Sequence, residues 1–319
     1  MKLQTKIPLE NKSNNLIDYN SNILLLGSCF VENIGNKLDY FKFQNLQNPF
    51  GILFQPLAIE KLITYAINEK EFTEKEIFFH NEQWHCYDAH SKLSHASKEE
   101  LLHGLNKQID LTAKQLNSSS HIIITLGTAW VYRHIETDAI VANCHKVPQK
   151  KFLKELITVD EISESLQSIV ELIRSVNKKA SILFTVSPVR HLKDGFIENT
   201  QSKAHLIAAI HSIMSPRAQS RGLHYFPSYE IIMDELRDYR FYAEDMIHPN
   251  QTAINYVWEK FQGVWISKGA TEIMDAVDYI QKGLQHKPFN SNSEAHQHFI
   301  QNLELKIKEI QSAHPKISF

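Results

Sequence analysis

The chain has 319 residues, of which 43% are hydrophobic and 22% are charged, a composition typical of a globular protein with one large domain. Its 34 basic and 36 acidic side chains give a formal net charge of −2, so no overall positive field attracts a nucleic-acid backbone. No segment has the length and apolar character of a membrane span, and the first residues lack the pattern of an export signal. We therefore expect neither nucleic acid nor a membrane as a partner.

The cysteines point to the compartment. Cys29, Cys86 and Cys144 are odd in number and widely spaced, which argues against a disulfide framework and agrees with a reducing environment. We predict a cytoplasmic protein. The sequence has no Gly-rich phosphate loop, no His-Glu-x-x-His and no paired Cys-x-x-Cys, so we expect neither a cofactor nor a metal.

Four short runs of aliphatic and β-branched residues predict buried strands of a parallel sheet. These runs are Ile23–Leu26, His121–Leu126, Ser181–Val186 and a weaker one at Leu223–Phe226. Stretches with apolar residues at helical spacing alternate with these runs. Their apolar positions are Val31, Ile34, Leu38 and Phe41, then Ile162, Leu166, Ile169 and Ile173; a third stretch extends from Ala253 to Trp265. This alternation predicts an α/β fold, a three-layer α/β/α sandwich. Ligands bind such sheets beyond the carboxyl ends of the strands, so the residues after each run are the first candidates for a site.

Two amphipathic stretches follow the last of these elements. Their apolar residues are Ile273, Val277, Ile280 and Leu284, then Phe299, Leu303, Ile307 and Ile310. We predict an N-terminal extension over residues 1–20, an α/β domain over residues 21–266 and a helical C-terminal extension over residues 267–319. The C-terminal helices either pack on the main domain or form a subunit contact that makes a homo-oligomer.

The segment Gly27-Ser28-Cys29-Phe30 follows the first run. A serine between a buried strand and a helix gains a fixed, solvent-facing hydroxyl and main-chain N–H groups that can bind negative charge. Both features suit a nucleophile in acyl transfer, with Gly27 allowing a tight turn. Alternatively, Ser28 only caps the helix. Cys29 is a rival nucleophile, although its apolar neighbours favour a small buried side chain.

A serine nucleophile needs a base, and the segment Asp245-Met-Ile-His248 offers one after the last strand. The carboxylate can reach Nδ1 of the imidazole and fix the tautomer that leaves Nε2 free to take a proton from Ser28. An Asp-x-x-His pattern is common by chance, so its position near the predicted strand ends carries most of its weight. We predict Ser28, His248 and Asp245 as nucleophile, base and orienting acid.

Histidines and basic residues form two further groups. His85-Cys86-Tyr87-Asp88-Ala89-His90, with Cys144-His145, offers ligand types that transition metals use, but a strand there would leave one three-ligand face at best. We prefer a place at the rim of the substrate site for His90 and His145. Arg190, with His191 and Lys193, could meet an anionic substrate group at that rim or remain a solvated loop.

Six segments of this sequence resemble the GSCFA family in content and in order. They are LLLGSCFVENIGNKL, NPFGILFQP, TLGTAWVY, VANCHKVP, TVSPVRHLKDG with its later NTQSK, and DMIHPN. Together they cover about residues 20 to 260. The family name derives from Gly27-Ser28-Cys29-Phe30 followed by alanine, and Val31 stands here in place of that alanine.

GSCFA proteins are similar to the SGNH/GDSL hydrolases, and this similarity implies a flavodoxin-like, mostly parallel sheet. In that superfamily the nucleophilic serine ends the first strand and Asp-x-x-His lies near the end of the domain, which corresponds here to Ser28, Asp245 and His248. The implied substrates are esters and acyl or acetyl groups. We therefore expect a small-molecule ester, an acetylated sugar or another acyl compound as the substrate.

The oxyanion hole implied by this resemblance is incomplete. Gly51 corresponds to the glycine of the second block, but the Gly-x-Asn block reads Gly127-Thr128-Ala129, so its asparagine is missing. The Thr128 hydroxyl or Asn143 could replace it, with the Ser28 and Gly51 N–H groups as the other donors. We predict an esterase or deacetylase; the alternatives are an acyltransferase with the same triad and a non-catalytic binding module of the same fold.

Overall fold

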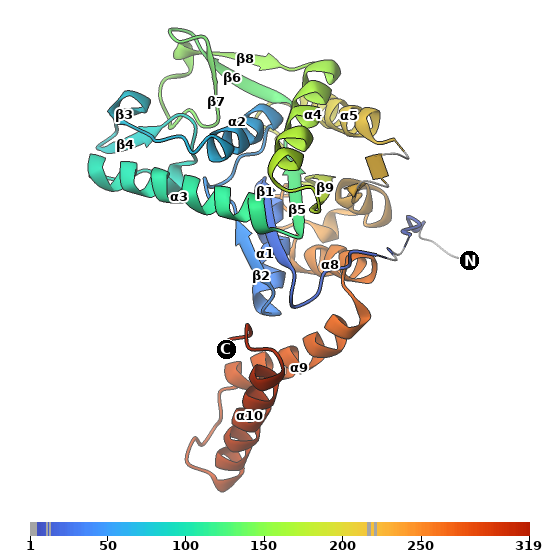
Figure 1. The fold of residues 1–319 in the computed structure, drawn as a ribbon. Helices are drawn as coiled ribbons and strands as arrows, with labels where there is room; N and C mark the ends of the chain where they lie inside the picture. The colour runs from blue at the N-terminus through green and yellow to red at the C-terminus, as the bar shows by residue number, and fades with distance from the viewer. Residues whose placement is uncertain (1–4, 11, 13, 216–217, 220–221) are drawn as a thin grey trace.

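A computed structural model describes residues 5–10, 12, 14–215, 218–219 and 222–319. At its centre lies a five-stranded parallel sheet with the order β10-β9-β5-β1-β2 (Figure 1). Its strands are β1 (Asn22–Gly27), β2 (Gln44–Gln47), β5 (His121–Leu126), β9 (Ser181–Val186) and β10 (Leu223–Tyr225). The order matches the flavodoxin-like arrangement, in which the strand order reverses between the first and third strands of the sheet. Here that switch point lies between β1 and β5.

The four apolar runs predicted as strands are all strands of this sheet. β1, β5 and β9 are almost fully buried, because helices cover both faces of the sheet. The prediction missed β2. Its sequence QNLQ is mostly polar and half-buried, and it pairs only with β1, at the edge of the sheet, where no apolar run is needed.

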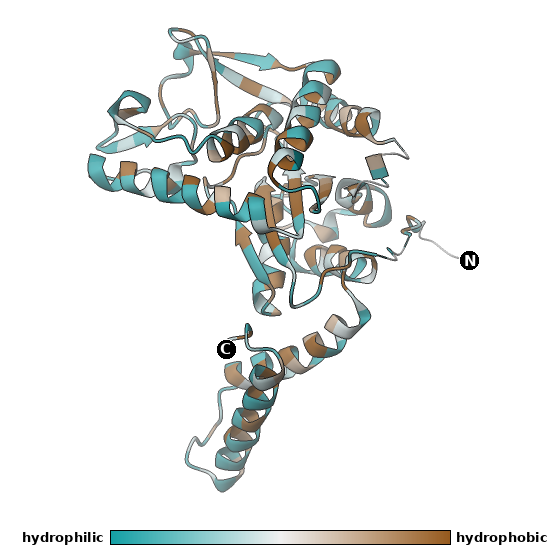
Figure 2. Cartoon of the chain, viewed as in Figure 1, coloured by the Kyte–Doolittle hydropathy of each residue, from teal (hydrophilic) through white to brown (hydrophobic). Residues whose placement is uncertain are grey.

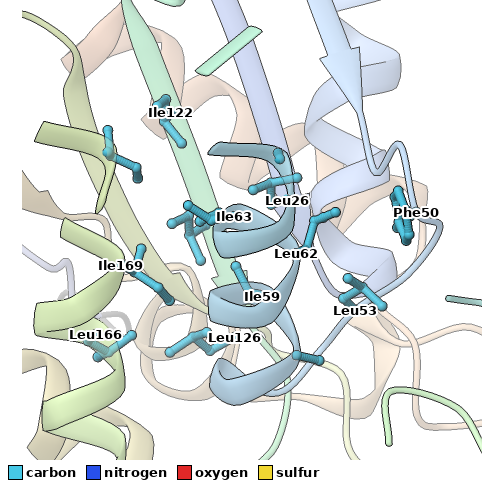
Figure 3. Packing of buried hydrophobic residues seen from close by; sticks show 14 of the residues in the cluster. Leu26, Phe50, Leu53, Ile59, Leu62, Ile63, Ile122, Leu126, Leu166 and Ile169 are labelled. Atoms are coloured by element: carbon cyan, nitrogen blue, oxygen red, sulfur yellow. The ribbon is translucent and has the colours of Figure 1, made fainter. Parts of the chain in front are cut away.

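One face of the sheet is covered by four helices: α2 (Pro56–Ile67), α3 (Lys98–Ser118), α4 (Val159–Val176) and α5 (Phe196–Ile213). Figure 3 shows Ile59, Leu62 and Ile63 of α2 packed between the strands and α4. Each such side chain contributes roughly 1.5–3 kcal/mol when it leaves water. Thr158 begins α4 with a capping box, which explains why the periodic stretch starts there.

The other face is covered by α1 (Cys29–Tyr40) and α8 (Gln251–Trp265), with the short α7 (Ser228–Glu230) and η4 (Ile231–Glu235) beside them. The central strands therefore stand between two apolar cores, which gives the predicted three-layer sandwich. In Figure 2 the hydrophobic colour is concentrated on the strands and on the helix faces turned toward them.

Two small antiparallel sheets lie outside the sandwich. They are β3 (Ile77–His80) with β4 (Gln83–Cys86), and β7 (Ala139–Val141), β6 (Trp130–His134) and β8 (Phe152–Leu156). Short 3-10 turns join them: η1 (Glu74–Glu76), η2 (Ser91–Leu93), η3 (Gln149–Lys151) and, further on, η5 (Tyr239–Phe241). The sequence analysis considered a strand over residues 85–90. Because β4 ends at Cys86, that expectation is wrong for the residues after Cys86.

The C-terminal helices are α9 (Lys268–Gln285) and α10 (Glu294–Ala313). They project from the body as a hairpin (Figure 1). Tyr40 of α1 donates a hydrogen bond to Asp278 at 2.8 Å and accepts one at its carbonyl from Gln281. Helix α9 thus packs on the main domain, while a subunit contact through these helices stays a prediction.

The N-terminal residues are attached to the same body. Ile17 is fully buried and forms a bridge with Ile266 at the end of α8. Residues 1–4, 11 and 13 of the predicted N-terminal extension lie outside the described residues. Within the described part of the chain, no helix is both long and apolar enough to cross a lipid bilayer.

Candidate active site

Ser28 stands between the end of β1 and the start of α1. Its main-chain N–H donates to the Thr125 carbonyl at 2.9 Å, and its hydroxyl accepts the N–H of Phe30 at 3.3 Å as the N-cap of α1. The side chain is only 1% exposed, so the expectation of a solvent-facing hydroxyl is wrong for this structure. The helix end offers a hydrogen bond to the hydroxyl and thereby draws it inward.

Gly27 makes this turn possible. Its φ angle is +134°, and a Cβ at this position would lie 2.1 Å from the Thr125 carbonyl oxygen, so no other residue fits without a shift of the strand. The loop that follows β2 fastens the turn: the Asn48 side chain accepts the Gly27 N–H at 2.9 Å, and Leu53 donates to the Gly27 carbonyl at 3.1 Å. Ser28 is therefore held by main-chain contacts on both sides.

The carboxyl ends of the three central strands form one row. Gly27 pairs with Thr125 of β5, which in turn pairs with Thr185 of β9. Ser28, Gly127 and Ser187 follow these strands, so they lie side by side at the switch point of the sheet. The three strand ends singled out from the sequence are brought together at this edge.

Asp245 and His248 form a tight pair in the loop before α8. Asp245 Oδ2 lies 2.6 Å from His248 Nδ1, while Oδ1 accepts the main-chain N–H groups of Ile247 and His248 at 2.9 and 3.0 Å. These hydrogen bonds, led by that from the His248 N–H, lower the pKa of Asp245 to about 2. The carboxylate therefore stays ionised near neutral pH and holds the imidazole through Nδ1. Nε2 of His248 is left free to accept a proton.

The nucleophile and the base do not touch in this structure. Among the described residues no hydrogen bond joins Ser28 to His248, and the His248 side chain is 51% exposed while Ser28 is buried. His191 packs against Gly127, and burial lowers the pKa of its imidazole, with the charges of Lys203 and His248 as lesser causes. The triad remains a prediction.

Cys29, the rival nucleophile, is partly buried against the apolar core between α1 and α8. Burial, reinforced by the nearby Glu32 carboxylate, raises the pKa of its thiol. A thiol that stays protonated is a weak nucleophile. This environment favours Ser28 over Cys29.

The groups predicted for the oxyanion hole are engaged elsewhere. The Gly51 N–H donates to the Asn48 carbonyl at 2.7 Å. The Thr128 hydroxyl bonds Ser202 Oγ at 2.9 Å and accepts the Trp130 N–H at 3.1 Å. With the Ser28 N–H also donated to a strand carbonyl, all three groups already have hydrogen-bond partners within the protein.

Asn143 lies at a cavity of about 220 Å³ beside Phe54. Its side-chain oxygen accepts the His145 N–H at 2.8 Å. The neighbouring Gln55 lines the same cavity, is 2% exposed, and neither amide atom of its side chain has a partner among the described residues. Aromatic rings and amides thus lie close to the strand ends.

The three predicted rim residues have different surroundings. His145 is 4% exposed, with Nε2 2.7 Å from the Cys86 carbonyl, so it belongs to the interior and not to a rim. His90 begins η2, and its Nδ1 accepts the Lys92 N–H at 3.2 Å. Arg190 stacks on Tyr242 with 4.7 Å to the ring centroid and donates to its hydroxyl, which ties it to the segment that carries His248.

The second histidine group is not arranged as a metal site. The rings of His85 and His145 lie 4.6 Å apart, but both nitrogens of His85 bond Ser94 and the His80 carbonyl. Burial lowers the pKa of His145 to about 4, so its ring is neutral near pH 7. Within the described residues, no cluster of three or more His, Cys, Asp or Glu side chains could hold a metal ion.

Lys203 is a buried cation that the sequence analysis did not single out. It lies on α5, is 1% exposed, and its Nζ donates to the carbonyls of Gly127 at 2.5 Å and Ser187 at 2.8 Å. Burial lowers its pKa to about 7. It binds the ends of β5 and β9 to each other. The signal in the sequence is the polar set Asn199, Ser202 and Lys203 on the buried face of a helix.

Comparison with known families settles the membership of the chain. The model of the GSCFA family matches residues 22–261, and that of the GSCFA domain protein, C-terminal domain, matches residues 277–319. The protein belongs to the GSCFA family. No curated protein matches the sequence. The GSCFA match includes Ser28, Asp245 and His248 together with all five strands of the central sheet, while the C-terminal match covers most of the α9–α10 hairpin.

Proposed function

We propose that this GSCFA protein is a serine hydrolase that cleaves a small ester or acetyl group. The observation that carries the proposal is the Asp245–His248 pair, whose 2.6 Å contact engages Nδ1 and leaves Nε2 as the acceptor. The nucleophile would be Ser28, at the switch point where sheets of this order bind their ligands.

The reaction would proceed through an acyl-enzyme. His248 takes the proton of Ser28 while Oγ attacks the carbonyl carbon, and the carbonyl oxygen becomes an oxyanion. Collapse of this intermediate expels the alcohol, which receives the proton from His248. Water then attacks the acyl-enzyme, gives its proton to His248 and releases the acid, restoring Ser28.

A rearrangement must precede this chemistry, because Ser28 is buried and does not contact His248. Within the part of the chain that the structure describes, the Ser28 hydroxyl has a single hydrogen bond, the 3.3 Å contact from the Phe30 N–H, which is weak by its length. A χ1 rotation of Ser28 would break that contact. Met246, in the loop of the base, has a φ of +56°, a conformation that suggests a loop with stored strain.

Acyl transfer is the second candidate, and the burial of Ser28 favours it. An acyl-enzyme that is shielded from bulk water lives longer and can pass its acyl group to a hydroxyl acceptor.

The cellular compartment is a separate part of the proposal. Because the three cysteines are free thiols, we propose that the enzyme works in a reducing compartment.

Hydrolysis of p-nitrophenyl acetate and of acetylated sugars tests the proposal. Ser28→Ala should abolish turnover. Ser293→Ala is the matched control because Ser293 also caps a helix, α10, far from the strand ends; it should retain full activity. Added alcohols or sugars separate hydrolysis from acyl transfer through the products. Ligand binding without turnover across the whole panel would instead indicate a binding module.

A further inference from the structure

The proposed reaction lacks an obvious donor for its oxyanion. In the SGNH/GDSL hydrolases, which GSCFA proteins resemble, a Gly-x-Asn block supplies an asparagine donor, but this chain reads Gly127-Thr128-Ala129 at that place. The Ser28 and Gly51 N–H groups are donated to main-chain carbonyls, and the Thr128 hydroxyl is hydrogen-bonded to Ser202. Loss of one such donor costs about 10²–10³ in kcat in a well-studied hydrolase. The strand ends should therefore contain another polar group with a free N–H.

His191 lies at this position. It follows β9, and its ring packs against Phe54 with 5.5 Å between ring centroids. A Cβ built on Gly127 would lie 3.2 Å from His191 Nε2 and 2.7 Å from Phe54 Cβ. The imidazole thus lies over the end of β5, the strand that pairs with β1 just before Ser28. Because Gly127 has no side chain, Nε2 can approach the strand end directly.

The nitrogen that faces Gly127 has no partner. His191 Nε2 is buried without a hydrogen bond among the described residues, whereas buried polar atoms are almost always paired. The main chain at this position is fixed, because the His191 N–H donates to Asn199 Oδ1 of α5 at 2.9 Å. An unpaired buried nitrogen costs the folded protein the free energy of removing that atom from water. A group that is held in place at such a cost suggests a partner that arrives with the substrate.

The charge state of His191 suits a donor and not a base. Burial, with the charges of Lys203 and His248 next in importance, lowers its pKa to about 3. The imidazole is therefore neutral in the pH range of the proposed reaction and carries one N–H. No carboxylate contributes to this shift, in contrast to His248, which is paired with Asp245.

The two histidines thus have separated environments. His248 is half exposed and bound to a carboxylate, which supports an imidazolium as it forms. The His191 side chain is only partly exposed, its Nε2 is buried without a hydrogen-bond partner among the described residues, and this burial disfavours an imidazolium. In known enzymes, pairs of titratable groups whose environments differ in this way take the separate roles of base and neutral electrophile, and one such electrophile is a neutral histidine.

We propose that His191 Nε2–H donates a hydrogen bond to the oxyanion formed during attack by Ser28, in place of the missing asparagine. The inference rests on the proposed hydrolase function. No proton is transferred in this interaction: the Ser28 proton goes to His248, the negative charge stays on the substrate oxygen, and His191 keeps its N–H. Cys29 N–H, at the first position of α1 where no intrahelical acceptor exists, can serve as a second donor.

The test compares four variants in ester hydrolysis. His191→Ala should lower kcat about 10²–10³-fold with little change in KM, because the donor acts on the transition state. His191→Asn restores an N–H and should recover most of the loss, whereas His191→Phe keeps the packing on Phe54 and should not. His103→Ala, on the exposed side of α3, is the matched control and should behave as the wild type.

Two further readouts separate this inference from the proposed function. The pH at which activity falls on the acid side should be unchanged in His191→Asn, because His248 remains the base. A fluorophosphonate should label Ser28 in the wild type and react much more slowly in His191→Ala and His191→Phe. If wild-type Ser28 is not labelled, the hydrolase function itself fails. Thermal melting establishes whether His191→Ala and His191→Phe are folded. If Ser28 is labelled and both folded variants keep a kcat within threefold of the wild type, only the role of His191 is overturned.

Discussion

Asp245→Asn is the substitution that most sharply tests the pairing of carboxylate and imidazole. In the wild type, Asp245 Oδ1 accepts two main-chain N–H groups and Oδ2 accepts His248 Nδ1–H. Asparagine has one oxygen and one NH₂ group. If its oxygen serves the main-chain donors, the NH₂ group faces Nδ1 and moves the imidazole proton to Nε2, so His248 can no longer accept the Ser28 proton.

The opposite orientation of the asparagine is no better. It would restore an acceptor for His248 Nδ1–H, but its NH₂ group would then face the N–H groups of Ile247 and His248. In a serine protease the same change lowers kcat about 10⁴-fold through the wrong tautomer. Here the two side chains are 46% and 51% exposed, so water can replace part of the interaction, and we expect a loss of about 10²–10⁴-fold.

The assay is kcat for ester hydrolysis between pH 5 and 9, with circular dichroism to establish that the variant is folded. Asp245 is ionised throughout this range because its hydrogen bonds lower its pKa to about 2, so titration of this carboxylate does not shape the wild-type profile. Asp278→Asn is the control: Asp278 also holds a hydroxyl and a cation, Tyr40 and Lys282, but lies on α9. A folded Asp245→Asn protein with kcat within threefold of the wild type would refute the assigned role.

Two further predictions concern the strand ends. Gly27→Ala should destabilise the protein by roughly 1–3 kcal/mol or more, because its φ is +134° and its Cβ would clash with Thr125; urea unfolding measures this, and a loss below about 0.5 kcal/mol would count against the described turn. The second prediction concerns Lys203, whose pKa is lowered by burial from 10.5 to about 7. Between pH 7 and pH 10.5 the unfolded chain therefore holds up to one more proton than the folded chain. The free energy of unfolding should rise with pH in this range, by at most about 1.4 kcal/mol per pH unit. The stability of the wild type relative to Lys203→Met should therefore increase from pH 7.5 to 9.5 and stay flat below pH 6; a difference independent of pH would show that Lys203 is not a buried cation.

The central sheet could be predicted from the sequence because both its faces are buried. β5 and β9 begin and end at the residues that bound the apolar runs, since a strand covered on both sides must be apolar throughout. β2 could not be predicted in this way, because the edge strand has only one neighbour and its half-buried polar residues leave no apolar run. The strands β6 and β7 were not predicted either, because they are short and only partly buried and so contain no continuous apolar run.

The candidate site was predicted only where its residues are local in sequence. Asp245 and His248 are three residues apart, so their contact follows from the loop alone. The burial of Ser28, the bridge from Lys203 to two strand ends and the approach of His191 to Gly127 each depend on segments that meet only in the folded chain. Apart from the polar set Asn199, Ser202 and Lys203 on one face of α5, nothing in the sequence indicates that these lysine and histidine side chains face the interior.

The central claim, that Ser28 is the nucleophile, is tested most directly by locating the adduct of a fluorophosphonate probe by mass spectrometry. We predict a single phosphonyl group on the peptide that contains Ser28, absent in Ser28→Ala and formed much more slowly in His248→Ala. Equal labelling of the wild type and Ser28→Ala, or an adduct on Cys29 instead, would contradict the account.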